Sequence, residues 1–143
     1  MKKDVLITIK GIQRADGDND VVELFTMGRF YRRNGSYYIS YDESEATGYE
    51  GSKTTLRVDE NQRVTMSRSG SLRSQLIIER GVRHQCNYDT GHGSFTIGVL
   101  GDSIVSSLTD QGGDIEFKYS LDVNASLTSE NEVYINVKEP AES

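Results

Sequence analysis

Apolar and polar side chains alternate along most of this chain. The first run places Val5, Ile7 and Ile9 on one side of the backbone and mainly polar residues on the other. Because successive side chains of a β-strand point to opposite faces, this alternation predicts a strand with one buried face. The same pattern recurs, and its runs cover about residues 21–33, 37–43, 54–58, 64–68, 82–88, 95–99, 115–123 and 133–137.

Short polar turns separate these runs, and the clearest is Asn34-Gly35 between the second run and the third. Both central residues of a type I′ hairpin turn need a positive φ, which Asn and Gly adopt readily. Asp16–Asp20 predicts a turn after the first strand, and Asp59–Gln62 predicts another. Successive hairpins of this kind favour an antiparallel meander.

Two segments are also open to a helical interpretation. Leu72 and Leu76 have the spacing of a short helix, and Asp102 has the chemistry to cap another over Ile104–Leu108. The second segment is rich in Ser and β-branched residues, so we favour a strand there. The first stays ambiguous, although a strand from about Leu76 to Glu79 fits its neighbours better.

Many short strands without a convincing long helix indicate an all-β sandwich or barrel. Closing the meander removes exposed sheet edges, and Gly28, Gly98 and Gly101 suit the sharp bends of a small barrel. We therefore expect an all-β fold, a single antiparallel up-and-down β-barrel of about eight to ten strands. The length of 143 residues fits one domain, placed at residues 1–138, with a polar tail at 139–143.

Composition and charge narrow the classes of partner. The formal net charge of -6 disfavours a nucleic-acid surface, because neutralising phosphates needs clustered Lys and Arg. Arg29, Arg32 and Arg33 surround Tyr31, but alternation divides them between the two faces of a strand. No apolar run approaches transmembrane length. The sequence thus predicts neither a nucleic acid nor a membrane as partner.

Cysteine usage and the start of the chain bear on localisation. Cys86 is the only cysteine, so no disulfide can form within the chain. Asp4, Thr8 and Lys10 interrupt any apolar core of an export signal. We therefore expect a cytoplasmic protein.

Several short stretches between about residue 4 and residue 138 occur together in a known family. They are Asp4–Gln13, Tyr38–Glu43, Thr47-Gly48, Thr54–Val58, Val64–Gly70, Tyr88–Gly93 and Gly112–Leu121. In this order they resemble the YwiB-like family, an uncharacterised bacterial group. The resemblance implies a calycin-like β-barrel related in architecture to lipocalins and fatty-acid-binding proteins. It implies no activity, so no catalytic residue is carried over from it.

Polar side chains share the apolar faces of several predicted strands. Glu43 follows Tyr41 on one face, Arg68 continues another, and His84 and Tyr88 share a third. A charge inside a barrel needs a partner, so we expect a Glu43–Arg68 pair near one mouth. Three interpretations are open. The pair anchors one end of a bound molecule, it is a purely structural ion pair, or the two residues lie at strand ends and reach water instead of pairing. The candidate ligand-binding residues are Tyr41, Glu43, Arg68, His84, Tyr88 and Tyr119.

The sequence carries no catalytic or metal-binding motif. His84 and Cys86 stand two positions apart on a strand, too far for an easy thiolate–imidazole contact, so a core cysteine beside a satisfied histidine is the better interpretation. A metal site built from His84, Cys86, Asp89 and His92 would lack the paired spacings of known sites. We expect no catalytic residues, no metal and no cofactor.

The leading functional hypothesis is a non-enzymatic barrel that binds a small, partly apolar molecule in its interior or mouth. The alternative is an interaction module, a filled barrel whose surface engages another protein or a second copy in a homo-oligomer. An enzyme is a third class, and its minimum sign is a cleft that holds His84 in a perturbed environment. The interior volume separates the first two hypotheses, because small barrels have room for side chains or for one small ligand.

Overall fold

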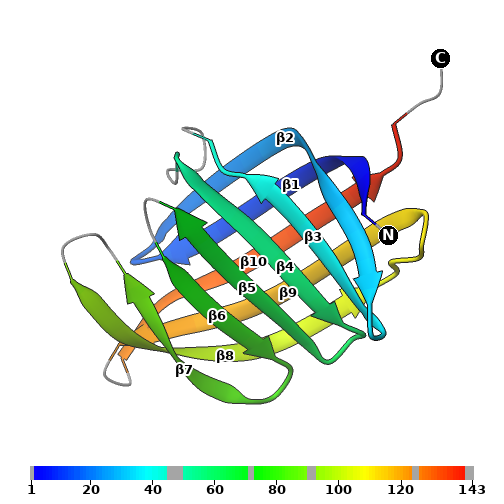
Figure 1. The fold of residues 1–143 in the computed structure, drawn as a ribbon. Coiled ribbons are helices and arrows are strands. Elements are labelled where there is room, and N and C mark those ends of the chain that lie inside the picture. The colour runs from blue at the N-terminus through cyan, green and yellow to red at the C-terminus, as the bar shows by residue number, and fades with distance from the viewer. Residues whose placement is uncertain (1, 45–49, 71–72, 90–92, 124–125, 141–143) are drawn as a thin grey trace.

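Ten antiparallel strands form one closed barrel within the described residues of the computed structural model (Figure 1). The structure describes residues 2–44, 50–70, 73–89, 93–123 and 126–140, without the side chains of 88, 89, 94 and 95. The all-β antiparallel barrel expected from the alternation is confirmed. The strands are β1 (Lys3–Ala15), β2 (Asp18–Arg33), β3 (Ser36–Asp42), β4 (Ser52–Asp59), β5 (Arg63–Gly70), β6 (Ser74–Glu79), β7 (Arg83–Asp89), β8 (Ser94–Ser106), β9 (Gly112–Val123) and β10 (Ser126–Lys138).

The strands follow one another around the barrel in chain order, and β1 closes it by pairing with both β2 and β10. The seam between β6 and β7 is the least regular, because its register contains only Ser74 opposite Tyr88. Beside it, the Ile77 backbone N–H donates to Cys86 Sγ at 3.4 Å. Cys86 is buried in the core, as its place in the alternation predicts.

Two hairpin turns have the backbone geometry that their residues favour. Asn34 and Gly35 have φ values of 52° and 83°, and Asp16 and Gly17 have 52° and 80°. The hairpin at Asp16 and Gly17 is tighter than the sequence predicts, since a type I′ turn needs only two central residues. Residues 18–20, assigned to that turn from their composition, are instead the start of β2.

Both segments with a helical alternative are strands where the structure describes them. In β6, Leu76 and Ile78 are buried and the residues between and beside them are less so, which is the period of a strand; Leu72 lies outside the described residues. The segment that begins at Asp102 belongs to β8, whose register shifts between Gly101 and Ser103. No helix among the described residues is long and apolar enough to span a membrane.

The largest fully buried side chains lie mainly in the half of the barrel that holds the start of β1 and the end of β10, two strand ends that Figure 1 shows side by side. Phe30 and Phe117 are the largest of them. Aliphatic side chains surround them from most of the other strands, among them Val5, Ile39, Val58, Val64, Ile78, Val99, Ile115 and Val137. The opposite half is less densely filled and contains the candidate site.

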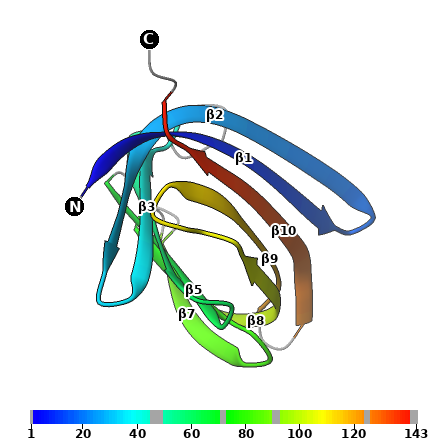
Figure 2. The same cartoon turned by 90° about the vertical axis from the view of Figure 1, so that its right-hand side faces the viewer.

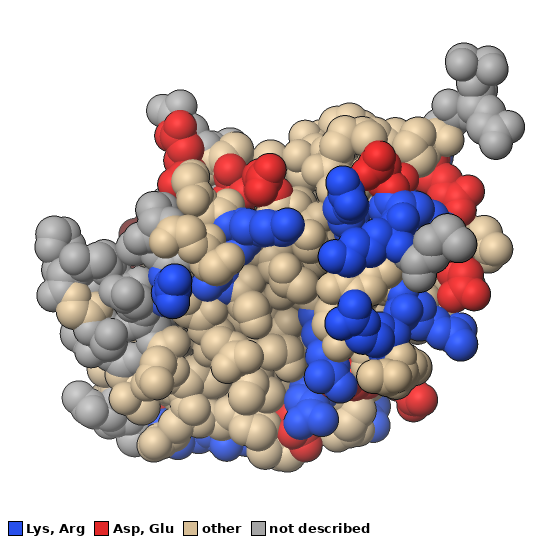
Figure 3. Space-filling view, in the orientation of Figure 1, with Lys and Arg blue, Asp and Glu red and all other residues tan. Residues whose placement is uncertain are grey.

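Cationic side chains gather on the outer face of the sheet (Figure 3). Tyr31 of β2 stacks on Tyr38 of β3 with ring centroids 4.8 Å apart, and Arg33 and Arg57 lie over the two rings. Arg32 is directed elsewhere and hydrogen-bonds Asp110. Alternation therefore places Arg32 and Arg33 on different sides of β2, as expected. Arg57 of β4 joins Arg33 beside the stacked tyrosines.

Gly28 is the residue at which β2 begins to pair with β3. A Cβ at this position would lie 2.3 Å from Ile7 Cδ1 and 2.4 Å from the Ser40 carbonyl oxygen. We expect Gly28→Ala to lower the free energy of unfolding by roughly 1–3 kcal/mol, measured by urea denaturation, because the packed backbone must shift. Gly11→Ala is the matched control, since no heavy atom lies within 4 Å of its Cβ position. Equal stability of the two variants would contradict this expectation.

Candidate functional site

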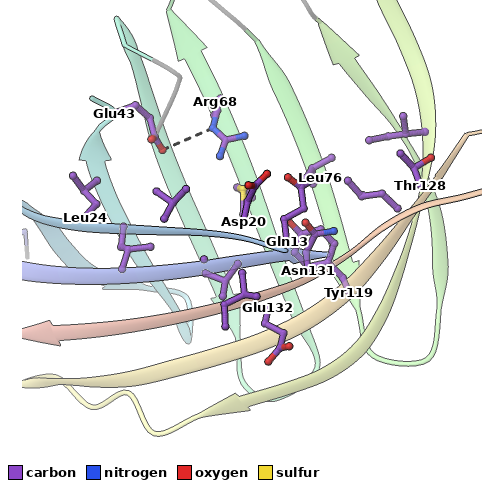
Figure 4. A pocket seen from close by; sticks show the side chains of 18 of the residues that line it. Gln13, Asp20, Leu24, Glu43, Arg68, Leu76, Tyr119, Thr128, Asn131 and Glu132 are labelled. Carbon is purple, nitrogen blue, oxygen red and sulfur yellow. Dashed lines mark ion pairs between the residues drawn. The ribbon is translucent and has the colours of Figure 1, made fainter. Parts of the chain in front are cut away.

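A cavity of about 370 Å³ occupies the open half of the barrel (Figure 4). Its volume falls within the range of small-molecule pockets, roughly 300–1,000 Å³. Its apolar walls are formed by Ile9, Ile12, Val22, Leu24, Met66, Leu76, Ile97, Leu121, Val123 and Val133. Its polar lining residues are Gln13, Asp20, Tyr41, Glu43, Arg68, Tyr119, Thr128, Asn131 and Glu132. The interior is therefore not filled by its own side chains.

Glu43 is a buried carboxylate on the wall of this cavity. It directly follows β3, and its backbone N–H donates to the Ser52 carbonyl at 2.8 Å, which secures the connection to β4. Its side chain is only 1% exposed, and Thr54 Oγ1 donates a hydrogen bond of 2.6 Å to Glu43 Oε1. Since Thr54 is itself fully buried, this carboxylate is separated from bulk water.

Arg68 supplies the compensating charge. The register of β4 and β5 places it directly opposite Thr54, and its Nε lies 3.8 Å from Glu43 Oε1. The expected Glu43–Arg68 pair is thus present, and the alternative in which Glu43 reaches water at a strand end is wrong. The guanidinium is more accessible than the carboxylate, with 12% of the Arg68 side chain exposed. Figure 4 shows the pair at one side of the cavity.

Tyr41 lies next to this pair on β3 and is buried. Burial raises the pKa of its hydroxyl well above the ordinary range of tyrosine, and the negative charge of Glu43 acts in the same direction. The positive charge of Arg68 opposes them only in part. Tyr41 therefore presents a neutral hydroxyl to its surroundings at physiological pH.

The other predicted residues have different positions. Tyr119 lines the cavity from β9, whereas His84 is not among the described lining residues. His84 is paired with Val99 of the packed core, and its Nε2 lies 3.0 Å from Glu79 Oε1. The side chain of Tyr88 lies outside the described part of the chain. Of the six predicted residues, the structure brings Tyr41, Glu43, Arg68 and Tyr119 to one cavity.

Several polar lining residues were not identified from the sequence. Gln13 of β1 lies directly opposite Asp20 of β2. The sequence alone predicts Asp20 in the turn between these strands. Asn131 is buried and donates to Ser129 Oγ at 3.0 Å. Gln13 and Asn131 both continue the alternation of the inward faces of β1 and β10, and Asn131 stands two positions before Val133. Extending each inward face past its last apolar residue would therefore have identified them.

Among the described residues, no group of three or more His, Cys, Asp or Glu is arranged to hold a metal ion. His92, which completed the metal-binding set considered from the sequence, lies outside those residues.

Comparison with known proteins places the chain in a family. A family model described as a domain of unknown function, DUF1934, matches residues 7–135. The chain belongs to this family. It is 29% identical over 125 residues to the uncharacterised β-barrel protein YwiB of Bacillus subtilis (strain 168), which covers 86% of each chain. The crystal structure of the ywiB protein from Bacillus subtilis matches with a TM-score of 0.85 and 22% identity, covering 98% of this chain and 94% of that one.

These matches confirm the YwiB-like family expected from the sequence and the β-barrel architecture of this DUF1934 chain. The descriptions of both matches name no activity, so they do not indicate a substrate or a ligand for the cavity.

The Glu43–Arg68 pair should dominate the stability of the open half of this DUF1934 barrel. Arg68→Met leaves Glu43 buried without its ion-pair partner, so we expect the free energy of unfolding to fall by about 3–5 kcal/mol. The double variant Glu43→Gln/Arg68→Met should recover most of that loss. Arg63→Met, at an exposed position of the same strand, should change stability by less than about 1 kcal/mol. A double variant no more stable in urea denaturation than Arg68→Met alone would contradict the coupling.

The raised pKa of Tyr41 predicts a loss of stability at alkaline pH. An unfolded tyrosine ionises at about pH 10, whereas folded Tyr41 keeps its proton above that value. Its contribution is therefore complete below about pH 10 and is lost as the pH rises further. Tyr41→Phe should flatten this decline in denaturation curves measured across the alkaline range. Tyr31→Phe, on the outer face, should keep the wild-type slope; a wild-type slope in Tyr41→Phe would count against the prediction.

Proposed function

We propose that this barrel binds a small, largely apolar molecule whose polar end carries a hydrogen-bond acceptor. The observation that carries the proposal is a cavity of about 370 Å³ in which Arg68 is the only cation among the described lining residues.

The walls of the cavity support an apolar body. Ten of the twenty lining residues are aliphatic or methionine. Ile9, Leu24, Leu121 and Val133 pack against the core but are only partly buried. Covering such surface is favourable by roughly 25 cal/mol per Å². The barrel thus offers apolar surface that its own side chains do not cover.

The chemistry of the charged pair supports an acceptor at the polar end. Both side chains line the cavity, but Arg68 is the more exposed of the two, and Glu43 already accepts a hydrogen bond from Thr54. A guanidinium donates hydrogen bonds and accepts none. A carbonyl or carboxylate oxygen therefore complements it, whereas an ammonium group does not. Glu43 holds the guanidinium in place and keeps the pair close to neutral, so the acceptor needs no full negative charge.

The other functional classes have less support. A filled interaction barrel is disfavoured by the open half of the interior, and the enzyme hypothesis loses its main candidate because His84 lies beside Glu79, away from the described cavity lining. The proposal retains the calycin-like architecture and the cytoplasmic location inferred from the sequence.

Calorimetric titration with three molecules of equal chain length tests the proposal. We expect decanamide and decanoate to bind saturably and decylamine to bind much more weakly, because only the first two present an acceptor. Arg68→Met should weaken decanamide binding by roughly 10–100-fold, the value of one or two hydrogen bonds to a charged group.

The matched control for binding is Arg63→Met, which keeps the cavity intact. The double variant Glu43→Gln/Arg68→Met guards against loss of folding and should also bind decanamide weakly. Absence of saturable binding by all three molecules, or equal affinity of wild type and the folded double variant, would refute the proposal.

A further inference from the structure

One edge of β2 lacks a neighbouring strand over most of its length. β2 pairs with β1 from Asp18 to Phe30, but with β3 only from Gly28 to Arg33. Within the described part of the chain, no strand pairs with the second edge of residues 18–27. Figure 2 shows this part of the β1–β2 hairpin extending past the neighbouring strands. With respect to the described residues, the backbone groups along that edge are therefore available for pairing with another chain.

Exposed apolar side chains concentrate on the same stretch. The described residues include nine exposed large hydrophobic side chains, and four of them lie between Val21 and Met27. Phe25 is 69% exposed and Met27 is 52% exposed. Proteins usually protect free edges with charged side chains, above all lysine, or with proline or a bulge, yet Val21–Met27 contains one charged residue, Glu23, and neither lysine nor proline. A free backbone edge and an uncovered apolar surface thus coincide, which indicates an interface.

The charge pattern of β2 indicates what covers this edge. Its first half is acidic, with Asp18, Asp20 and Glu23, and its second half is basic, with residues 29, 32 and 33 all arginine. Two copies of β2 placed antiparallel bring the acidic half of each toward the basic half of the other. A parallel arrangement would oppose like charges instead. Antiparallel pairing about a two-fold axis also closes at two copies, since both use the same surface.

The geometry points to a homodimer in which Val21–Met27 of β2 pairs antiparallel with the same residues of a second copy of this chain. The pairing cannot extend past Gly28, where β3 occupies the edge. A two-fold axis at Leu24 therefore uses the whole apolar stretch and places Val21 opposite Met27 of the second copy. A hollow of about 460 Å³, lined in part by Met27, Gly28 and Tyr41, leaves room where the β2–β3 ladder ends.

This inference does not depend on the proposed ligand, although the two surfaces adjoin. Val22 and Leu24 line the cavity from the same stretch of β2 whose edge would meet the second copy. The dimer would thus add a strand beside one wall of the cavity.

Sedimentation velocity over a dilution series tests the dimer. We expect a concentration-dependent dimer for the wild type and a monomer for Phe25→Lys/Met27→Lys, which places charges on the edge without touching the core. Val105→Lys is the matched control, because Val105 is 59% exposed on β8, and it should remain dimeric. Circular dichroism verifies that each variant is folded.

A cysteine placed on the two-fold axis tests the register. Residues directly opposite across antiparallel strands have Cα atoms about 4.5–5.5 Å apart, within reach of a disulfide. Leu24→Cys should therefore form a disulfide-linked dimer under mild oxidation, whereas Thr8→Cys, exposed on β1, should not. A monomeric wild type at all concentrations, a dimer that Phe25→Lys/Met27→Lys leaves intact, or equal cross-linking of the two cysteine variants would overturn the inference.

Discussion

The burial of the Glu43 carboxylate is the constraint on which the open half of this barrel depends. A charge that is 1% exposed requires a partner, and Thr54 and Arg68 meet that requirement from β4 and β5. Strands β4 and β5 must therefore keep the register in which Thr54 lies opposite Arg68. The buried Glu43–Arg68 pair thus holds this part of the barrel together, whereas apolar packing stabilises the other half.

The cavity follows from this division of the interior. Phe30, Phe117 and the aliphatic residues around them fill the half near the start of β1. In the other half, a buried ion pair and neutral Tyr41 stand where large apolar side chains would otherwise pack. Because the walls beside the pair remain apolar, the resulting space has an apolar body and one polar end. Both properties are those of a site for a small amphiphilic molecule.

Alternation predicted much of the fold and the central pair of the site, and its failures have physical causes. It identifies the face of a strand on which a side chain lies, which was enough for Glu43 and Arg68. It does not identify depth along the barrel axis, so His84 was grouped with them although its partner across the ladder is core Val99. It does place Asn131 inward, two positions before Val133, but this residue was missed because the inward face of β10 was counted only over its apolar residues. The free edge of β2 depends on where β3 departs from it, and no local pattern encodes that point.

The central claim is that the cavity beside Glu43 and Arg68 holds a small molecule with an apolar body and an acceptor end. Native mass spectrometry of freshly purified protein measures this directly, because it weighs each chain together with what it retains. We predict an added small-molecule mass that is released on denaturation, is identifiable as such a compound, and is absent from the folded Glu43→Gln/Arg68→Met variant. A bare chain mass that persists after incubation with excess decanamide would contradict the claim.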